Sequence, residues 1–432
     1  GLVKEKFGLE LTEFLPALSD DMGEITDRVR YAYWSTATER FIESWDKQVY
    51  EWCDKNQLMY IGEKPILRSG ELKYTHVPGI DAGHQKFGSK AVLAQSRYRS
   101  NGKIVSSAAH FYGKPAVLCE AFHSIGWGMT LQDAKWIFDW LAVMGIDWFI
   151  THGAYYTTDG LKKHDAPPSF FYQMPWWKHT HILADYADRL QQFLINGKRN
   201  VSVLILDPIT STWTEIDQRL KMMNEDFAQF QNELLRKGID YYVMDPQLFA
   251  EGQVSEKEGK TVYENQKDSY EIIVLPFMTN IEPEAVSILQ DYVKQGGTVL
   301  AVGTLPFKEF EHSRYGDWIE QAFGIDPKVA YQRYFSDDHM GKEGWNGKCF
   351  FSSDMYRVID EIFALEESKR IWKVKVPDNG EILQIQCTGK EGKKQLFLVN
   401  VGAKRQSVEI TKGMCTVSRE IDGGESLFLE AG

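Results

Sequence analysis

The sequence predicts an α/β protein built from more than one folding unit. Apolar runs typical of buried parallel strands alternate along most of the chain with segments of helical periodicity. After about residue 370 this pattern gives way to short alternating strands bounded by Gly, Asn and Asp. A length of 432 residues is enough for two or three domains. We therefore divide the chain into three units, residues 1–198, 199–345 and 346–432.

Residues 1–198 contain four strand-then-helix units in succession. The predicted strands are apolar runs at 58–63, 73–81, 115–122 and 146–156. The predicted helices cover 34–56, 103–113, 131–145 and 176–194. Thr130 is a suitable N-cap for the third helix, and Gly145 is a suitable C-terminal stop. Repeated strand-then-helix units predict a parallel sheet, and four of them make half of a (β/α)8 barrel.

Residues 199–345 show a second parallel pattern. Its strands are predicted at 201–208, 239–245, 271–277 and 298–303, with helices at 214–237 and 282–295. This order is typical of a doubly wound, flavodoxin-like domain of the glutamine-amidotransferase type. The first strand leads into LDPITSTWTE, which is not a Gly-rich phosphate-binding loop, so we predict a non-catalytic domain. Within residues 346–432 a small β-sandwich is predicted from strands at 372–376, 382–387, 394–401 and 407–411.

The composition excludes several classes of function. The chain has 61 acidic and 49 basic residues, and its formal net charge of −12 repels nucleic-acid phosphates. It has no apolar run approaching the roughly 20 residues that a membrane span needs. Its five cysteines include no C-x-x-C pair, so neither a disulfide framework nor a zinc site is predicted. The first residues contain no visible targeting signal, and the compartment stays unassigned.

Carboxylates at strand ends are the leading catalytic candidates. In a parallel barrel the chemistry takes place where the strands end, and the residues there include Glu63, Asp81 and Glu120. Glu120 ends an otherwise apolar strand, where an ionisable group costs several kcal/mol unless a partner or a function compensates. We predict that Glu120 is catalytic, the alternative being a structural ion pair with an arginine at the rim. Glu63 is the second candidate, although Lys64 beside it also fits an exposed ion pair.

Polar and aromatic residues near these strand ends predict a carbohydrate subsite. Sugars stack their C–H faces on aromatic rings and bind polar side chains through their hydroxyls. The candidate substrate-binding residues are His123, Trp127, His152, Tyr155, Asp165, Gln173 and Trp176. For His152 the alternative is a structural hydrogen bond, and for Trp176 it is burial in the core. The motifs of zinc proteases, serine hydrolases, P-loop enzymes and Rossmann dehydrogenases do not occur.

Several of these segments together resemble a known enzyme family. The catalytic barrel of the glycoside hydrolase family 106 α-L-rhamnosidases is similar to the stretch that runs from FIESWDKQVYEWCDKNQLMYIGE through VPGID and AVLCEAFHSIGWGMT to APPSFFYQMPWW. The resemblance covers about residues 1–195. The later units are similar to accessory domains of large barrel glycosidases, including the family 42 β-galactosidases. The resemblance implies that residues 1–198 are the second half of a barrel that hydrolyses glycosides.

The resemblance also implies roles for individual residues. Glu120 takes the position of the carboxylate at the end of the seventh barrel strand, as general base in an inverting enzyme or nucleophile in a retaining one. A calcium ion near the sugar is implied, without assignable ligands, and no other cofactor or metal is expected. The acid carboxylate of such barrels ends the fourth strand, and KEKFGLELTEFLPAL resembles the segment that follows it.

We therefore expect the other half of the barrel to come from a preceding segment or from a partner chain, with homo-oligomerisation as a further alternative. The expected substrate is a plant or microbial polysaccharide or glycoside. Two alternatives to an α-L-rhamnosidase stay open: a β-galactosidase-like barrel glycosidase, and a non-catalytic sugar-binding or scaffold protein with an incomplete barrel.

Overall fold

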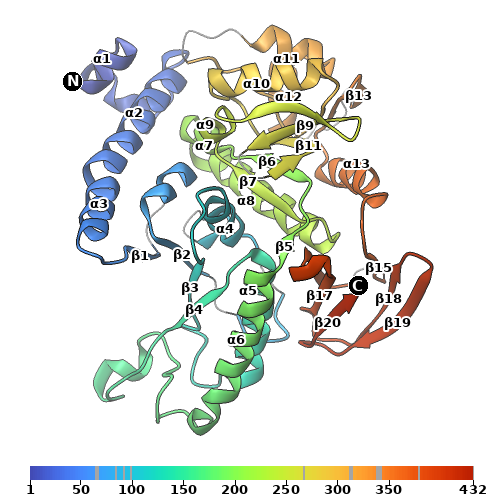
Figure 1. Cartoon of the computed structure of the whole chain (residues 1–432). Coiled ribbons are helices and arrows are strands. Elements are labelled where there is room, and N and C mark those ends of the chain that lie inside the picture. Colours follow the sequence, from blue (N-terminus) through green and yellow to red (C-terminus); the bar gives the residue numbers. More distant parts are fainter. Residues whose placement is uncertain are drawn as a thin grey trace.

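The computed structural model describes residues 1–63, 68–82, 85–90, 93–97, 100–265, 268–310, 315–336, 343–377 and 380–431. Figure 1 shows three groups of strands: the sheet of β1 to β4 at lower left, a larger sheet with helices around it at the top, and the C-terminal strands at lower right. The sequence-based assignment to the α/β class is confirmed by this arrangement of sheets and helices.

The four-stranded sheet is parallel throughout, and its strands lie in chain order. They are β1 (Ile61–Glu63), β2 (Val77–Asp81), β3 (Leu118–Ala121) and β4 (Trp148–Thr151). The register pairs Asp81 with Glu120, so these two strand-end carboxylates lie at the same level. Gly79 has to be a glycine, because a Cβ atom there would lie 2.9 Å from both the Gly62 backbone and the Leu118 side chain.

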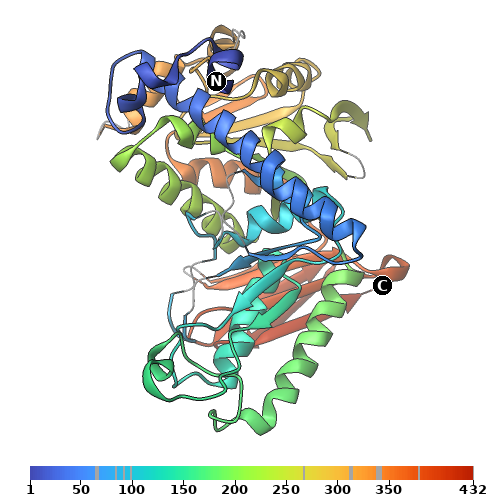
Figure 2. The same cartoon turned by 90° about the vertical axis from the view of Figure 1, so that its left-hand side faces the viewer.

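A long N-terminal helix connects this sheet to the larger one. Figure 2 shows it in blue, running diagonally down across the molecule. It consists of α2 (Ile25–Phe41), a π-helical turn (Ile42–Asp46) and α3 (Lys47–Lys55). It begins nine residues before the predicted start at residue 34 because its first turns bury polar side chains. Arg30, for example, is buried and donates to the backbone oxygens of Ala17 and Thr214, so hydrophobic periodicity does not reveal this part of the helix.

The other helices of this unit agree with the sequence pattern. They are α4 (Gly102–Phe111), α5 (Leu131–Met144) and α6 (Thr180–Asn196). Thr130 and Asp133 form a reciprocal capping box at the start of α5, and Gly145 ends the helix in the left-handed conformation. Residues 73–76, which we predicted to begin a strand, instead overlap the 3-10 turn η4 (Ser69–Tyr74).

The larger sheet has the strand order β13-β14-β12-β11-β6-β7 and is parallel except for β13. Its parallel strands are β6 (Val203–Leu206), β7 (Tyr241–Met244), β11 (Ile272–Pro276), β12 (Thr298–Val302) and β14 (Cys349–Ser352). The sheet extends past residue 345, where we placed the boundary. The reason is that β14 pairs with β12, about 50 residues earlier in the chain, and a run of four residues carries too little local pattern to predict that pairing.

The other helices and strands that precede the C-terminal strands are as follows, with α1 packed on α2. The helices are α1 (Leu2–Phe7), α7 (Ile209–Thr214), α8 (Asp217–Arg236), α9 (Pro246–Phe249), α10 (Pro283–Lys294), α11 (Gly316–Phe323), α12 (Pro327–Tyr334) and α13 (Met355–Glu367). The antiparallel edge strand is β13 (Gly344–Asn346), and a separate three-stranded sheet contains β8 (Gln253–Lys257), β9 (Lys260–Asn265) and β10 (Asp268–Tyr270).

The C-terminal strands form two antiparallel sheets that share a small apolar core around Trp372 and Leu398. One sheet contains β15 (Lys373–Lys375), β18 (Gln406–Lys412) and β19 (Cys415–Ile421). The other contains β20 (Ser426–Ala431), β17 (Lys394–Asn400), β16 (Ile382–Thr388) and β5 (Lys198–Arg199). Because β5 pairs with β16, the segment between the first two units belongs to the third one's sheet.

Buried contacts join the three units. One continuous apolar core extends from α4 and α5 through β6, β7 and α8 to β16 and β17. Arg68 crosses from the first unit to the second, where its guanidinium binds both oxygens of Asp245 and also Glu282. All five cysteines are free thiols. Among the described residues, no helix combines the length and the apolar character that a membrane crossing requires.

Candidate active site

Glu120 lies on the face of the four-stranded sheet that the helices leave uncovered. Alternate residues of a strand point to opposite faces. Cys119 and Ala121 belong to the main core on the helix-covered face, whereas Leu118 belongs to a separate small cluster with Val77. Glu120 shares the orientation of Leu118, so it faces the side we call the open face. Its side chain is 33% exposed, which leaves room for a ligand.

Glu120 is paired with His152, which follows the neighbouring strand β4. Nδ1 of His152 lies 2.7 Å from Oε1 of Glu120. A carboxylate accepts hydrogen bonds only, so the proton lies on Nδ1 of the imidazole. Within the described residues, neither Oε2 of Glu120 nor Nε2 of His152 has a hydrogen-bond partner. The pair therefore presents one carboxylate oxygen and one ring nitrogen to a ligand.

A second carboxylate–histidine pair lies beside the first. Nε2 of His123 is 2.7 Å from Oδ1 of Asp81, and Nδ1 of His123 is 3.0 Å from Oγ of Ser124. The His123 and His152 rings meet edge to face, with centroids 5.6 Å apart. Sequence reasoning placed Asp81 at a strand end but gave it no role. Its signal in the sequence was the same as that of Glu120, a carboxylate at the end of a strand, and the register of the structure then pairs the two residues.

Tyr155 connects this cluster to the loop after β4. Its ring lies edge to face with those of His152 and Trp127, with centroids 6.5 and 6.1 Å away. Its hydroxyl donates to the backbone oxygen of Asp165, and its own backbone oxygen accepts from Nε2 of Gln173 at 2.7 Å. Burial and the nearby Asp165 carboxylate raise the pKa of Tyr155. The hydroxyl therefore stays protonated at neutral pH.

The two tryptophans among the candidates have different surroundings. Trp127 is half-buried beside Tyr155, and its indole N–H donates to the backbone oxygen of Lys163 at 2.6 Å. Trp176 packs against the main core near Phe170, and its N–H donates to the backbone oxygen of Met129 at 2.9 Å. The structure thus brings Trp127 to the carboxylate–histidine cluster, whereas the contacts of Trp176 are those of a core residue.

Glu63 lies deeper in the sheet than Glu120. It ends β1, is half-buried and pairs in register with Gly79, two residues before Asp81. The ion pair with Lys64 that we considered as an alternative lies outside the described residues. Over the described part of the chain, no group of three or more His, Cys, Asp or Glu side chains is arranged to hold a metal ion. Among these residues, the implied calcium ion therefore has no group of three such side chains to bind it.

The family profile of the glycoside hydrolase family 106 alpha-L-rhamnosidases matches residues 2–362. This chain belongs to that family. The match extends through the larger sheet and confirms the resemblance seen in the sequence. A protein of Formosa agariphila named "Putative beta-glucuronidase" is 25% identical over 316 residues, which are 70% of this chain and 24% of that protein. The chain thus spans about a quarter of the length of this curated relative.

Solved structures of glycosidases share the fold. A rhamnosidase from Novosphingobium sp. PP1Y superposes over 99% of this chain and 42% of its own, with a TM-score of 0.68 and 16% identity. Gan42B, a family 42 beta-galactosidase from G. stearothermophilus, superposes over 100% of this chain and 75% of its own, with a TM-score of 0.66 and 12% identity. At these identities the likeness concerns the fold alone.

Proposed function

We propose that this member of the rhamnosidase family works in the hydrolysis of α-L-rhamnosides, with Glu120 as the carboxylate that acts on the sugar or on the attacking water. One observation carries the proposal: Glu120 ends a parallel strand on the open face, with Oε1 bound by His152 and Oε2 facing no protein partner among the described residues. Active sites of parallel α/β barrels lie at this end of the strands.

The side chains around Glu120 suit this chemistry. A carboxylate can remove a proton from water in an inverting enzyme or attack the sugar carbon in a retaining one, and both roles need an ionised oxygen free to reach the substrate. His152 donates to the opposite oxygen and so fixes the direction of the reactive one. Trp127 and Tyr155 offer ring edges and faces on which the C–H surface of a sugar packs.

We also propose the type of fold to which each of the three units belongs. The four-stranded sheet is half of an eight-stranded barrel, the larger sheet is a flavodoxin-like accessory unit, and the C-terminal strands are a β-sandwich. Known parallel sheets are covered on both faces. Here Ile61 of β1 and Trp148 and Ile150 of β4 are 39%, 38% and 45% exposed, on the two outermost strands. Four further strands, from the same polypeptide, a partner chain or a second copy, would cover them.

A second carboxyl group is required, because hydrolysis of a glycoside needs an acid for the leaving oxygen as well as a base or nucleophile. We assign this acid to the other half of the barrel. Glu63 is proposed as a supporting carboxylate, because it lies on the same sheet but one level deeper than Glu120. Among the substrate-binding candidates, His123 acts by holding Asp81 in place, and Asp165 and Gln173 act by holding Tyr155.

The test is hydrolysis of aryl glycosides by the protein with the proposed other half of its barrel present, and by the Glu120→Gln variant of the same assembly. We expect release of the aryl group from aryl α-L-rhamnoside, and a loss of at least a thousandfold in kcat for the variant. Asp147→Asn is the matched control, because Asp147 is a carboxylate at the opposite end of the same sheet. Full turnover by Glu120→Gln would rule out the assignment.

A β-galactosidase-like activity is the second candidate, because the family 42 beta-galactosidase superposes over the whole chain. Aryl β-D-galactoside and aryl β-D-glucuronide in the same assay separate these possibilities. Sugar binding measured by calorimetry, without turnover of any aryl glycoside, would instead indicate the non-catalytic alternative.

Calcium dependence is proposed from the family resemblance only. We expect treatment with a chelator to lower activity and added calcium to restore it. Activity that a chelator does not change would remove calcium from the proposal, without affecting the role of Glu120.

A further inference from the structure

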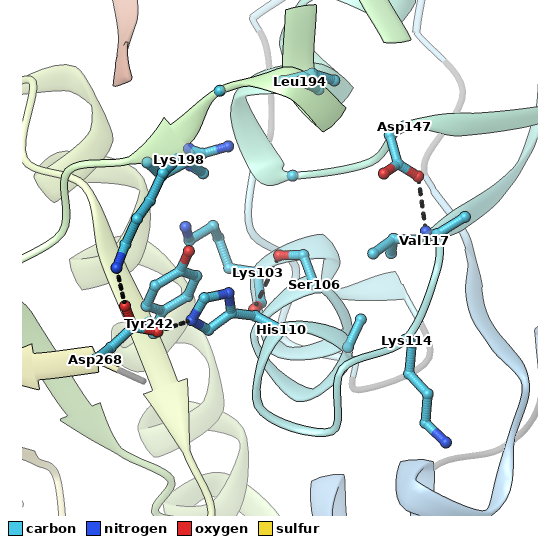
Figure 3. A pocket seen from close by; sticks show the side chains of 15 residues that line it. Lys103, Ser106, His110, Lys114, Val117, Asp147, Leu194, Lys198, Tyr242 and Asp268 are labelled. Carbon is cyan, nitrogen blue, oxygen red and sulfur yellow. Dashed lines mark hydrogen bonds and ion pairs between the residues drawn. The ribbon is translucent and has the colours of Figure 1, made fainter. Parts of the chain in front are cut away.

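A cavity of about 350 Å³ lies where the three units meet, at the opposite end of the four strands from Glu120. Val117 and Asp147, which line it, directly precede β3 and β4. Side chains from α4, β5, β7 and β10 complete the lining, so each of the three units contributes. Figure 3 shows Lys103, His110, Lys198, Tyr242 and Asp268 grouped on one side, with Asp147, Val117 and Lys114 on the other.

The first side carries an excess of basic groups. We call Lys103, His110, Lys198 and Arg199 the basic wall. Asp240 is shared by Lys103 and Arg199, at 2.9 and 2.8 Å. Asp268 is likewise shared by His110 and Lys198, at 2.6 and 2.8 Å. Two carboxylates are therefore shared among four basic groups. With His110 neutral, the three cations Lys103, Lys198 and Arg199 exceed the two carboxylates by one positive charge.

This local excess contrasts with the rest of the molecule, whose formal net charge is −12. Like charges that are gathered in a partly buried place repel one another and cost free energy unless a counter-charge is present. Lys103 shows the effect, because burial, with a contribution from Arg199, lowers its pKa to about 8 even though Asp240 opposes the shift. A group in this position gains from an additional negative charge in the cavity.

The side chains of the basic wall differ in how many of their N–H groups already donate hydrogen bonds within the protein. Arg199 donates to Asp240 and to the backbone oxygens of Ala142 and Val143, so it contributes charge more than free hydrogen bonds. Lys198 is 66% exposed and makes one ion pair, so its ammonium group has N–H bonds left for a ligand. His110 stacks on Tyr242 with ring centroids 4.2 Å apart, which holds its ring at the edge of the cavity.

Asp147, on the opposite side of the cavity, limits the length of the anion that can bind. Asp147 accepts from the backbone N–H of Val117 at 2.7 Å, and burial raises its pKa to about 6. A long anion would bring a negative group against this carboxylate, whereas a compact one stays at the basic wall. The volume is also small for a drug-sized or oligosaccharide ligand.

We propose that the basic wall binds one small doubly charged oxyanion, with phosphate and sulfate as the two forms of this chemistry. Oxygen atoms of such an anion accept charge-assisted hydrogen bonds from the lysine ammonium groups. Because the basic wall and its carboxylate partners Asp240 and Asp268 together come from all three units, the bound anion would join them and raise the stability of their junction. This site is independent of the proposed hydrolase function, whose residues lie at the other end of the strands.

Isothermal calorimetry and thermal unfolding test the proposal, with sodium phosphate, sodium sulfate and, at equal ionic strength, sodium chloride. We expect saturable binding of one phosphate or sulfate per chain, an increase in Tm that follows its concentration, and no such increase with chloride. The oxyanion with the lower Kd, phosphate or sulfate, is the preferred ligand. An equal rise in Tm with chloride, or no saturable heat with either oxyanion, would overturn the proposal.

Lys198→Ala is the decisive variant, because its side chain is largely exposed and its loss leaves the core unchanged. We expect it to weaken anion binding at least tenfold. Lys221→Ala is the matched control: Lys221 is 62% exposed, pairs with one carboxylate, Glu225, and does not line the cavity. If Lys198→Ala does not fold, anion binding is measured with His110→Gln instead. Equal binding by the Lys198 and Lys221 variants would contradict the site.

Discussion

Nδ1 of His152 lies 2.7 Å from Oε1 of Glu120, and this hydrogen bond joins the ends of two neighbouring parallel strands on the open face of the sheet. It fixes one oxygen of the carboxylate and leaves the other for chemistry. The histidine is thus a positioning residue in the proposed mechanism, because it acts through Glu120.

Replacing His152 by Asn tests that positioning role. Asn keeps an N–H donor but not the reach of the imidazole, so we expect kcat on an aryl α-L-rhamnoside to fall by about 10- to 100-fold, in the range of a lost charge-assisted hydrogen bond. KM should change little, because the sugar is bound mainly by other side chains. A rise in KM with an unchanged kcat would instead make His152 a binding residue.

Asp81→Asn should disturb His123 and leave Glu120 in place. The Asp81 carboxylate holds the proton of His123 on Nε2, whereas an amide can donate as well as accept, so the preference between the two ring nitrogens weakens. Nitrogen NMR of the histidine rings measures this change directly and needs no substrate. An unchanged His123 spectrum in the variant would show that Asp81 does not set the tautomer.

Arg68→Met is expected to lower the free energy of unfolding by about 3–5 kcal/mol, the cost of removing one partner from a buried ion pair. Arg68, Asp245 and Glu282 are all buried, and the variant would leave two carboxylates without their cation. Arg405→Met is the control, since Arg405 is 62% exposed and its ion pairs contribute at most about 1 kcal/mol. Chemical denaturation of both variants measures the difference.

If the loss in Arg68→Met comes from uncompensated charge, removing a carboxylate should restore part of it. Burial already raises the pKa of Glu282, so Glu282→Gln costs little and is the natural second change. We expect the double variant Arg68→Met/Glu282→Gln to be more stable than Arg68→Met alone. A double variant that is less stable would show that packing, and not charge, dominates at this position.

Asp147 predicts a specific pH dependence of stability. Burial raises its pKa from 3.8 to about 6, so the folded protein holds this proton more tightly than the unfolded chain. The protonated Asp147 therefore contributes fully to the free energy of unfolding below pH 3.8, and this contribution is lost as pH rises to about 6. A shift of two pKa units corresponds to a change of about 3 kcal/mol in the free energy of unfolding. Asp147→Asn keeps the bond from Val117 and removes the titration.

Denaturation curves at a series of pH values check this prediction. Between pH 4 and 6, the free energy of unfolding of wild type should fall relative to that of the variant by about 3 kcal/mol. The same slope in both proteins would mean that Asp147 is not the titrating group.

Much of the fold could be predicted because the signals are local. The capping pair of Thr130 and Asp133, the stop at Gly145 and the apolar strands around Glu120 all depend on neighbours within a few residues. The pairing of β14 with β12 could not be predicted, since the two segments lie about 50 residues apart and meet only through the packing of the whole sheet. The early start of α2 was hidden for a related reason: the partners of Arg30 come from elsewhere in the chain.

For the candidate site, the sequence by itself determined which residue types end the strands, and thereby identified Glu120, His152 and Tyr155 as candidates. Only the tertiary structure decided their partners. The register of β2, β3 and β4 brings Asp81 level with Glu120 and places His152 within reach, and the loop after β4 folds Tyr155 back onto Trp127. Strand ends follow from local apolar patterns, whereas contacts between strands depend on the packing of the whole sheet.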